Sequence, residues 1–251
     1  MIAATLPDLP ALTGAAAFAA GVLNAIAGGG SFLTFPALVF AGVPPVAANA
    51  TSAMAVSPGY LGSTLGFRPE LRSLPASLLR REVGVAALGG LLGAGLLLVT
   101  PAKVFAGIVP WLLLLATALF ALGPHIARLS GGAGHPRWRV PGLLGVSVYG
   151  GYFNGGLGIL LMALYTLTGE SRLHTVNALK NLNSLVLSLL SVAAFALAGA
   201  IVWPQAVWMM LWATAGGWAG AHLAKRLPVR WVRRLVIATG LVMSVVFFSR
   251  A

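Results

Sequence analysis

Long apolar runs separated by short polar segments make up most of the chain. A helix that crosses a bilayer needs about 20 predominantly apolar residues. The runs that we expect to cross completely are 44–67, 82–99, 104–122, 171–199, 204–224 and 229–249, and the runs that glycines interrupt are 11–42 and 140–168. The alternating segments of roughly 10 residues that build a transmembrane β-barrel do not occur. The pattern therefore predicts an all-α polytopic membrane protein.

The first interrupted run contains three consecutive glycines, Gly28, Gly29 and Gly30. Each glycine destabilises a helix by about 1 kcal/mol relative to alanine. We expect two short helices that meet at these glycines, with Ser31 as the N-cap of the second helix. The whole run is then predicted to enter the membrane and return as a hairpin.

The second interrupted run repeats the spacing of the first. Asn24 and Gly28 recur as Asn154 and Gly158, with the same separation between the asparagine and the glycine in each half. A polar, glycine-broken segment at corresponding positions in two halves is the best sequence-level indication of a transporter's binding site.

Basic residues are placed differently around the glycine-rich spans of the two halves. Arginines precede the span 82–99, in the segment 67–81, whereas Lys and Arg follow the span 204–224, in the segment 225–234. Lys and Arg collect in cytoplasmic loops, so equivalent loops of the two halves are expected on opposite sides of the membrane. This relation is typical of inverted repeats.

We therefore expect two inverted repeats, residues 1–130 and 131–251, divided within the polar loop 123–139. Each repeat is predicted to contain one glycine-broken hairpin and about three transmembrane helices. In this topology the loop 123–139 and both arginine-rich segments face the cytoplasm, and both termini lie outside.

The formal net charge of +12 comes from 16 Lys and Arg against 4 acidic residues. Such a balance is common in nucleic-acid-binding proteins, but here most basic residues flank apolar runs, where they orient a membrane protein. We expect a lipid bilayer and no nucleic acid as the partner, and the oligomeric state stays open. The acidic residues lie near termini or in loops, so we expect no intramembrane carboxylate that binds sodium or a proton.

Signals for catalysis, a metal or a cofactor are weak. There is no G-x-S-x-G elbow and no His, Asp or Glu cluster with the spacing of metal ligands. The absence of cysteine excludes disulfides and thiolate metal sites. We expect neither an enzyme nor a cofactor, with an intramembrane enzyme that uses Ser31 and His174 as a distant alternative.

The interrupted runs form the predicted substrate site. A short helix that begins inside the membrane presents N–H groups and a partial positive charge, which suits an anion. The predicted substrate-binding residues are Asn24, Gly28, Gly29, Gly30, Ser31, Asn49, Ser52, Asn154, Gly158, Asn177, Lys180 and Asn181. As alternatives, the asparagines can join helices by hydrogen bonds, and glycines elsewhere in the spans can serve close helix packing.

Lys180 has the most specific predicted role. In the span 171–199 it lies about 13 Å from the start, at a rise of ~1.5 Å per residue, and so near the midplane. A charge at that depth is unfavourable and usually faces a functional cavity; the alternative is that the side chain extends to the cytoplasmic interface. Ser52 stands at the equivalent position of the first half, so the predicted site is asymmetric.

Three stretches together resemble the TauE/SafE family of sulfite exporters: LNAIAGGGSFLTFPALVFAGVPPVAANATS, YFNGGLGILLMALYTLTGESRLHTVNALKNL and GAIVWPQA. The resemblance covers nearly the whole chain. It implies an inner-membrane carrier of bacteria or archaea that moves sulfite, or organosulfonates such as sulfoacetate, usually outward. The positions that match are Asn24, Gly28–Gly30, Asn49, Asn154, Gly158, Asn177 and Lys180.

The leading interpretation is a multi-pass secondary transporter of the inner membrane that exports a small sulfur-containing anion by alternating access. The chain has no P-loop sequence that would indicate ATP-driven transport. A passive anion channel of the same architecture and a carrier for another small organic anion are the alternatives. The anion, the direction of transport and the coupling ion stay open.

The basic residues generate a prediction about topology. A single cysteine at position 78 and one at position 228 should react with an impermeant thiol reagent from the same, cytoplasmic side, and the chain has no native cysteine to interfere. Labelling of intact cells and of inverted vesicles measures this. Reaction of the two cysteines from opposite sides would exclude the inverted-repeat topology.

Overall fold

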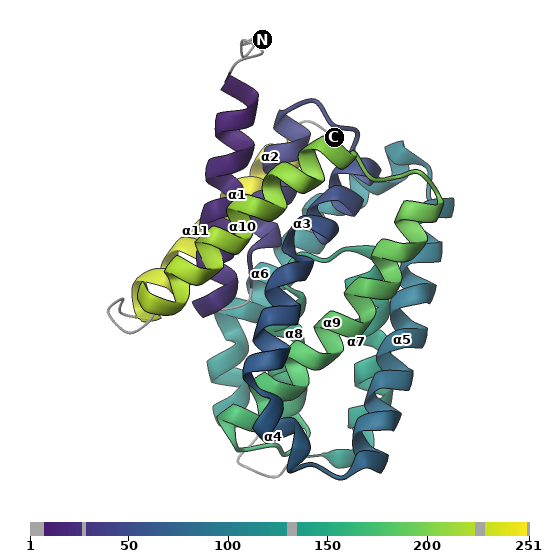
Figure 1. Ribbon diagram of the computed structural model, residues 1–251, viewed down its shortest axis with the longest axis vertical. Helices are drawn as coiled ribbons and strands as arrows, with labels where there is room; N and C mark the ends of the chain where they lie inside the picture. Colours follow the sequence, from purple (N-terminus) through teal and green to yellow (C-terminus); the bar gives the residue numbers. More distant parts are fainter. Residues whose placement is uncertain (1–7, 27–28, 130–134, 224–228, 250–251) are drawn as a thin grey trace.

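The computed structural model describes residues 8–26, 29–129, 135–223 and 229–249 (Figure 1). All elements in these ranges are helices, as predicted, and no strand occurs among them. The elements are α1 (Asp8–Ile26), α2 (Ser31–Phe40), α3 (Pro45–Gly66), α4 (Arg68–Arg72), α5 (Ala76–Val99), α6 (Ala102–Leu129), the 3-10 turn η1 (Pro136–Trp138), α7 (Arg139–Tyr152), α8 (Leu157–Leu167), α9 (Leu173–Leu197), α10 (Trp203–Leu223) and α11 (Val229–Phe248).

Three helices of the described chain are long and apolar enough to cross a membrane: Ala76–Val99, Ala102–Leu119 and Leu173–Leu197. Shorter apolar stretches occur in α1, α2, α8 and α11. This set is typical of a membrane protein. The predicted number of complete crossings stays a prediction.

Two of the predicted loops are partly helical. The segment 67–81 contains α4, and α5 already begins at Ala76, so Glu82 and the two arginines before it lie on a helix. Likewise α6 continues to Leu129, into the predicted loop 123–139. The boundary of α5 was wrong because polarity marks the edge of the apolar run, whereas Arg is a good helix former that continues a helix beyond it. The extension of α6 contains Gly123 and Pro124, and helix propensity does not explain it.

Each glycine-broken run forms two helices that contact each other, α1 with α2 and α7 with α8. In Figure 1 the pair α1–α2 lies in the upper part of the molecule and the pair α7–α8 in the lower part. The second helices, α2 with 10 residues and α8 with 11 residues, are too short to cross a bilayer core by themselves.

Glycines allow helices from opposite halves to pack backbone against backbone. α1 packs on α10 and α7 packs on α5. A Cβ atom at Gly216 of α10 would overlap the carbonyl oxygen of Phe18, and one at Gly93 of α5 would overlap that of Val148. The packing role predicted for the glycines of these two spans is confirmed.

The two contacts correspond to each other along the sequence. Gly151 of α7 approaches Gly90 of α5, and Gly21 of α1 approaches Gly217 of α10. Gly21 and Gly151 stand at equivalent positions, each at the same separation before the asparagine that recurs between the halves. In the same way α3 contacts α10 as α9 contacts α5, and α2 contacts α11 as α8 contacts α6. Each glycine-broken pair therefore packs against the last two helices of the other half.

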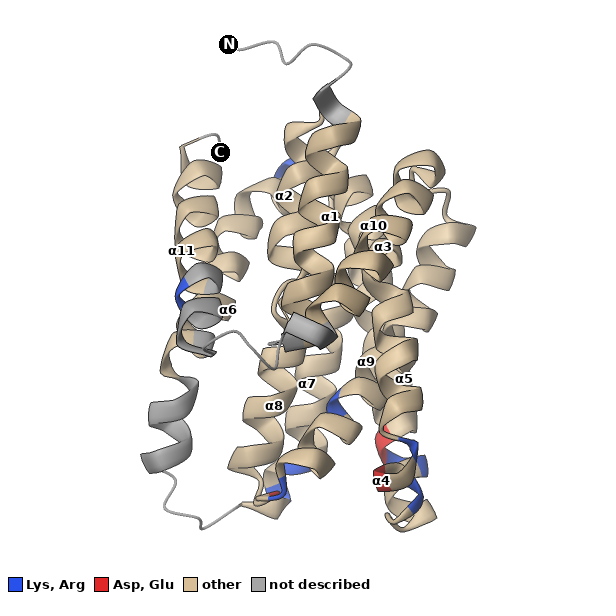
Figure 2. Cartoon of the chain, turned by 60° about the vertical axis from the view of Figure 1, so that its left-hand side comes forward, with Lys and Arg blue, Asp and Glu red and all other residues tan. Residues whose placement is uncertain are grey.

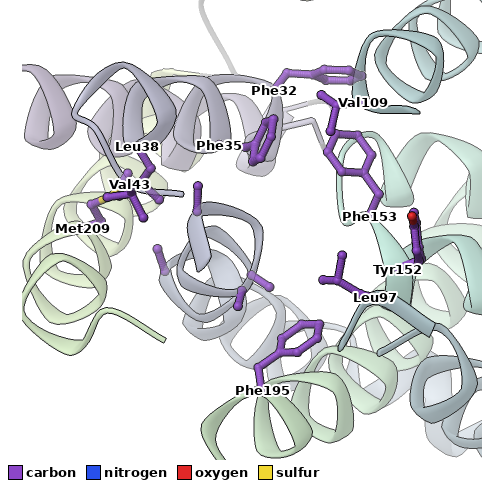
Figure 3. Packing of buried hydrophobic residues seen from close by; sticks show 14 of the residues in the cluster. Phe32, Phe35, Leu38, Val43, Leu97, Val109, Tyr152, Phe153, Phe195 and Met209 are labelled. Atoms are coloured by element: carbon purple, nitrogen blue, oxygen red, sulfur yellow. The ribbon is translucent and has the colours of Figure 1, made fainter. Parts of the chain in front are cut away.

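The larger apolar core joins the two halves around aromatic rings (Figure 3). The ring of Phe35, on α2, lies 5.4 Å from that of Phe153, which follows α7, and 5.5 Å from that of Phe247 on α11. Phe105 of α6 contacts Tyr152 at 5.6 Å. The first glycine-broken pair is thus anchored to residues of the second.

Many basic residues of the described chain lie toward one end of the helices (Figure 2). They occur at the lower ends of α4 and α5, in the predicted cytoplasmic segment 67–81, and at the lower ends of α7 and α8; Lys103, Lys180 and Arg234 lie elsewhere, on α6, α9 and α11. The third predicted segment, 225–234, lies partly outside the described residues. The side of the membrane stays a prediction.

The glycine contacts predict a difference between two substitutions in one helix. Gly93→Ala should prevent α5 from closing on α7 and lower stability by about 1–3 kcal/mol, because backbone has to move. Gly95→Ala has open space around the new methyl group and should stabilise the helix by up to about 1 kcal/mol. Thermal unfolding of the purified variants in one detergent measures both; equal unfolding temperatures would contradict the packing role of Gly93.

Candidate functional site

The first break is held by an asparagine side chain. Asn24, near the end of α1, accepts a hydrogen bond on Oδ1 from the backbone N–H of Gly30, at 2.8 Å. Gly29 is buried, whereas Gly28 lies outside the described residues. Ser31 is the first residue of α2 and the N-cap is Gly30, without a side-chain hydrogen bond, so the predicted capping by Ser31 is wrong. The amide of Gly30 already has its partner in Asn24.

The second break lies slightly before the predicted position. Phe153 is extended and Gly156 has a left-handed φ of 76°, and α8 begins directly after it. Gly158 is therefore a helical residue in the first turn of α8, not part of the break. The sequence could not separate the neighbouring glycines, because only the backbone shows which one adopts the left-handed conformation that a Cβ atom disfavours.

Two further side chains satisfy backbone groups at the second break. The hydroxyl of Tyr149 donates to the carbonyl of Gly155 at 2.7 Å. Asn49 of α3 is 3% exposed, and its Nδ2 donates to the carbonyl of Tyr152 at 3.0 Å. Unpaired backbone groups are unfavourable inside a membrane, so Asn49 stabilises the break from another helix.

Two further polar residues, Asn154 of the second break and Ser52 of α3, are also paired. Oδ1 of Asn154 accepts from the hydroxyl of Tyr60 at 3.3 Å. The hydroxyls of Ser52 and Thr34 lie 2.6 Å apart and join α3 to α2. Both Asn154 and Ser52 are buried.

The two breaks approach each other directly. A Cβ atom at Gly156 would lie 3.2 Å from the ring of Phe32, the second residue of α2, and 2.9 Å from Cβ of Ala116. Together with the contact between Phe35 and Phe153, this closes the centre between the breaks with aromatic side chains.

Lys180 lies apart from these contacts. It is buried at 8% exposure on α9, and among the described residues it has no ion-pair or hydrogen-bond partner. Its neighbour Asn181 is buried as well. Asn177 is half-buried and donates to the carbonyl of Leu173 in its own helix, at 3.1 Å. No hydrogen bond of the described chain joins Lys180, Asn181 or Asn177 to either break.

A buried charged cluster escaped the sequence analysis. Glu82 of α5 is 2% exposed, and its Oε1 lies 2.6 Å from Nε of Arg139, the first residue of α7. Its Oε2 accepts from the hydroxyl of Tyr165 (α8) at 2.5 Å and from Nδ2 of Asn183 (α9) at 3.0 Å. The expectation that the acidic residues lie near termini or in loops is therefore wrong for Glu82, which is buried on α5.

Helical spacing could have identified Glu82. Glu82, Ala86, Gly89 and Gly93 stand at positions i, i+4, i+7 and i+11, which share one face of a helix. That face packs on α7 through the two glycines. The prediction failed because Glu82 is the first residue of the predicted span 82–99, directly after two arginines, and was therefore taken to lie near a loop.

No group of three His, Cys, Asp or Glu side chains that could hold a metal ion occurs in the part of the chain that the structure describes. The donors gathered at the breaks are amides, hydroxyls and backbone N–H groups. In this structure they pair with groups of the protein, and the buried Lys180 lies on a neighbouring helix.

The family model of the sulfite exporter TauE/SafE matches residues 13–247. The chain belongs to this family.

It is also similar to curated proteins, each named as a probable membrane transporter protein. The one from Haemophilus influenzae is 29% identical over 94% of this chain and 93% of its own. YfcA from Escherichia coli K12 is 29% identical over 91% of this chain and 85% of its own. ORF9 from a Sinorhizobium species is 26% identical over 92% of this chain and 88% of its own. No solved structure matches the chain. This membership, together with the apolar helices, identifies a membrane transporter.

Gly156 yields a prediction with a matched control. Gly156→Ala and Gly42→Ala both place a methyl group on a left-handed residue, with φ of 76° and 86°, and each should lose about 1 kcal/mol of stability. Only at Gly156 does the new Cβ also meet Ala116 and Phe32. Gly156→Ala should therefore reduce transport strongly, whereas Gly42→Ala should retain it. Equal transport by the two variants at equal membrane abundance would contradict a special role of the second break.

Proposed function

We propose that this protein is a multi-pass secondary transporter of the inner membrane that exports a small sulfur-containing anion, sulfite or an organosulfonate such as sulfoacetate. The observation that carries the proposal is the convergence of two broken helix pairs, one from each half, beside a helix with a buried and unpaired lysine. Membership of the TauE/SafE family supports the substrate class.

The packing of the helices supports inverted repeats and alternating access. Corresponding contacts occur between α1 and α10 and between α7 and α5, and the glycine-broken pairs lie toward opposite ends of the molecule (Figure 1). Two units related in this way can exchange conformations, so that a site between them opens first to one side and then to the other.

The closed centre favours a carrier over a passive channel. Phe32, Phe35 and Phe153 fill the space between the breaks, so an anion can pass only after the helices move. A channel conducts through a path that stays open for many ions. Flux that saturates and shows counterflow supports the carrier, and flux without counterflow contradicts it.

Lys180 supplies the charge for the anion in this proposal, with the amides and hydroxyls at the two breaks as further donors. Because no described acidic side chain neutralises it, a bound anion would provide the missing counter-charge. A buried ion without a partner is strongly unfavourable, and intramembrane ionisable residues usually mark substrate pathways.

The role of Lys180 can be tested with two substitutions and a control. Lys180→Gln should weaken anion binding at least tenfold, about 1.4 kcal/mol, because the counter-charge is lost. Lys180→Arg keeps the charge but should also weaken binding, since the forked guanidinium does not fit the space of an ammonium. Lys103→Gln removes an exposed charge and should change little. Thermal shift of the purified proteins against sulfite, sulfoacetate, taurine, thiosulfate, sulfate and carboxylates measures binding; near-normal affinity of Lys180→Gln would exclude the proposed role.

A further inference from the structure

The cluster around Glu82 joins four helices at the end where the basic side chains concentrate. Glu82 is on α5, and its three donors are on α7, α8 and α9. Among the acidic side chains that the structure describes, only that of Glu82 is buried. Any separation of α8 or α9 from α5 therefore breaks a hydrogen bond to this carboxylate.

The same position in the other half is apolar. Gly90 and Gly217 are equivalent, which makes Met209 the counterpart of Glu82. In the same way, the equivalence of Asn24 and Asn154 makes Phe35 the counterpart of Tyr165, and that of Ser52 and Lys180 makes Ala55 the counterpart of Asn183. These three residues belong to one buried hydrophobic cluster. The fold is therefore compatible with apolar side chains at this contact, and a buried ion pair is by itself weak evidence for added stability.

One hydrogen-bond acceptor in this cluster has no partner. Oδ1 of Asn183 is buried and has no partner, although Asn183 is fully buried and its Nδ2 contacts Glu82. Nη2 of Arg139 is also buried without a partner. Oε2 of Glu82 already accepts two hydrogen bonds, from Tyr165 and Asn183, so a proton added to this oxygen displaces one of these donors and needs an acceptor. Rotation of the Asn183 amide would offer that acceptor.

We propose that Glu82 is a proton-binding residue, and that its protonation releases Arg139 and Tyr165 and allows the end of the molecule around α4, α5 and α8 to open. The proton on Glu82 is then donated to Oδ1 of Asn183. As a step of a transport cycle this rests on the function proposed above and on the topology predicted from the basic residues, in which that end faces the cytoplasm. The proton site itself does not depend on the identity of the anion.

Other titratable groups near the cluster are few. Arg139 from α7 and Tyr165 from α8 face Glu82 directly, and from α9 the uncharged Asn183 does so. Lys180 lies one turn before Asn183 on the same helix, and the arginines that precede Glu82 on α5 are exposed. Of the described histidines, His135 and His174 are exposed and are the residues to exclude by control.

A cysteine at position 184 can report the opening without any substrate. Ser184 is fully buried beside Asn183, and the chain has no native cysteine. The rate at which a maleimide labels Ser184→Cys in proteoliposomes is measured at each pH. This rate is divided by the rate for Ser77→Cys, an exposed position in the first turn of α5, because the reactivity of a thiol itself depends on pH. The ratio should rise as pH falls, by at most about tenfold per pH unit, because the opening is coupled to one proton.

Substitutions decide whether Glu82 is responsible. Glu82→Gln should give a high ratio that no longer depends on pH, because the amide resembles the protonated acid. Glu170→Gln removes an acid that pairs with exposed Arg172, and it should leave the pH dependence unchanged, as should His135→Gln and His174→Gln. A ratio in the unsubstituted chain that is independent of pH, or a Glu82→Gln variant that keeps the pH dependence, overturns the proposal.

A second variant tests the same proposal if Glu82→Gln does not fold. Should Glu82→Gln fail to fold, Glu82→Met combined with Arg139→Met replaces the whole pair by apolar groups, which is often neutral for stability. This variant should label independently of pH, and persistence of the pH dependence overturns the proposal. A failure of all anions to be transported would contradict only the proposed function, since the labelling needs no anion.

Discussion

Every backbone N–H and C=O group inside a bilayer needs a partner from the protein, and this requirement governs the two helix breaks. An interrupted helix loses the hydrogen bonds that its own turns would supply. Here Asn24 bonds to the amide of Gly30, Tyr149 to the carbonyl of Gly155 and Asn49 to the carbonyl of Tyr152. Asn24 and Asn49 therefore have a structural task at the breaks.

The close contacts between glycines extend this constraint to the whole fold. Because α1 packs on α10 and α7 packs on α5 without intervening side chains, each broken pair is held closely by helices of the other half. In the alternating access proposed above, the moving units would therefore not be the two sequence repeats. Each unit would combine the glycine-broken pair of one repeat with the last two helices of the other.

Corresponding positions in the two halves differ in chemistry although their backbone contacts correspond. Lys180 is buried without a partner where the first half has Ser52, paired with Thr34. Glu82 is surrounded by hydrogen-bond donors where the second half has Met209 in an apolar cluster. Each difference puts a charged side chain where the other half has an uncharged one, so a motion that exchanges the two halves need not have equal free energies at its two ends.

The sequence by itself determined the helical class, the approximate extent of most helices and the position of the first break. Apolar run length, consecutive glycines and recurrent spacing are local properties of the chain, and they are sufficient for these conclusions. Even the recurrence of Asn24 as Asn154 required only a comparison of the chain with itself.

The tertiary structure alone decided which helices meet and which polar groups are paired. The bond between Asn49 and Tyr152 spans 103 residues, and the ion pair of Glu82 with Arg139 spans 57 residues. No local pattern encodes such separations, because they arise from the packing of glycine faces between opposite halves. The same packing buries the carboxylate of Glu82, which lies at the edge of a polar segment in the sequence. It also leaves Lys180 buried without a counter-charge.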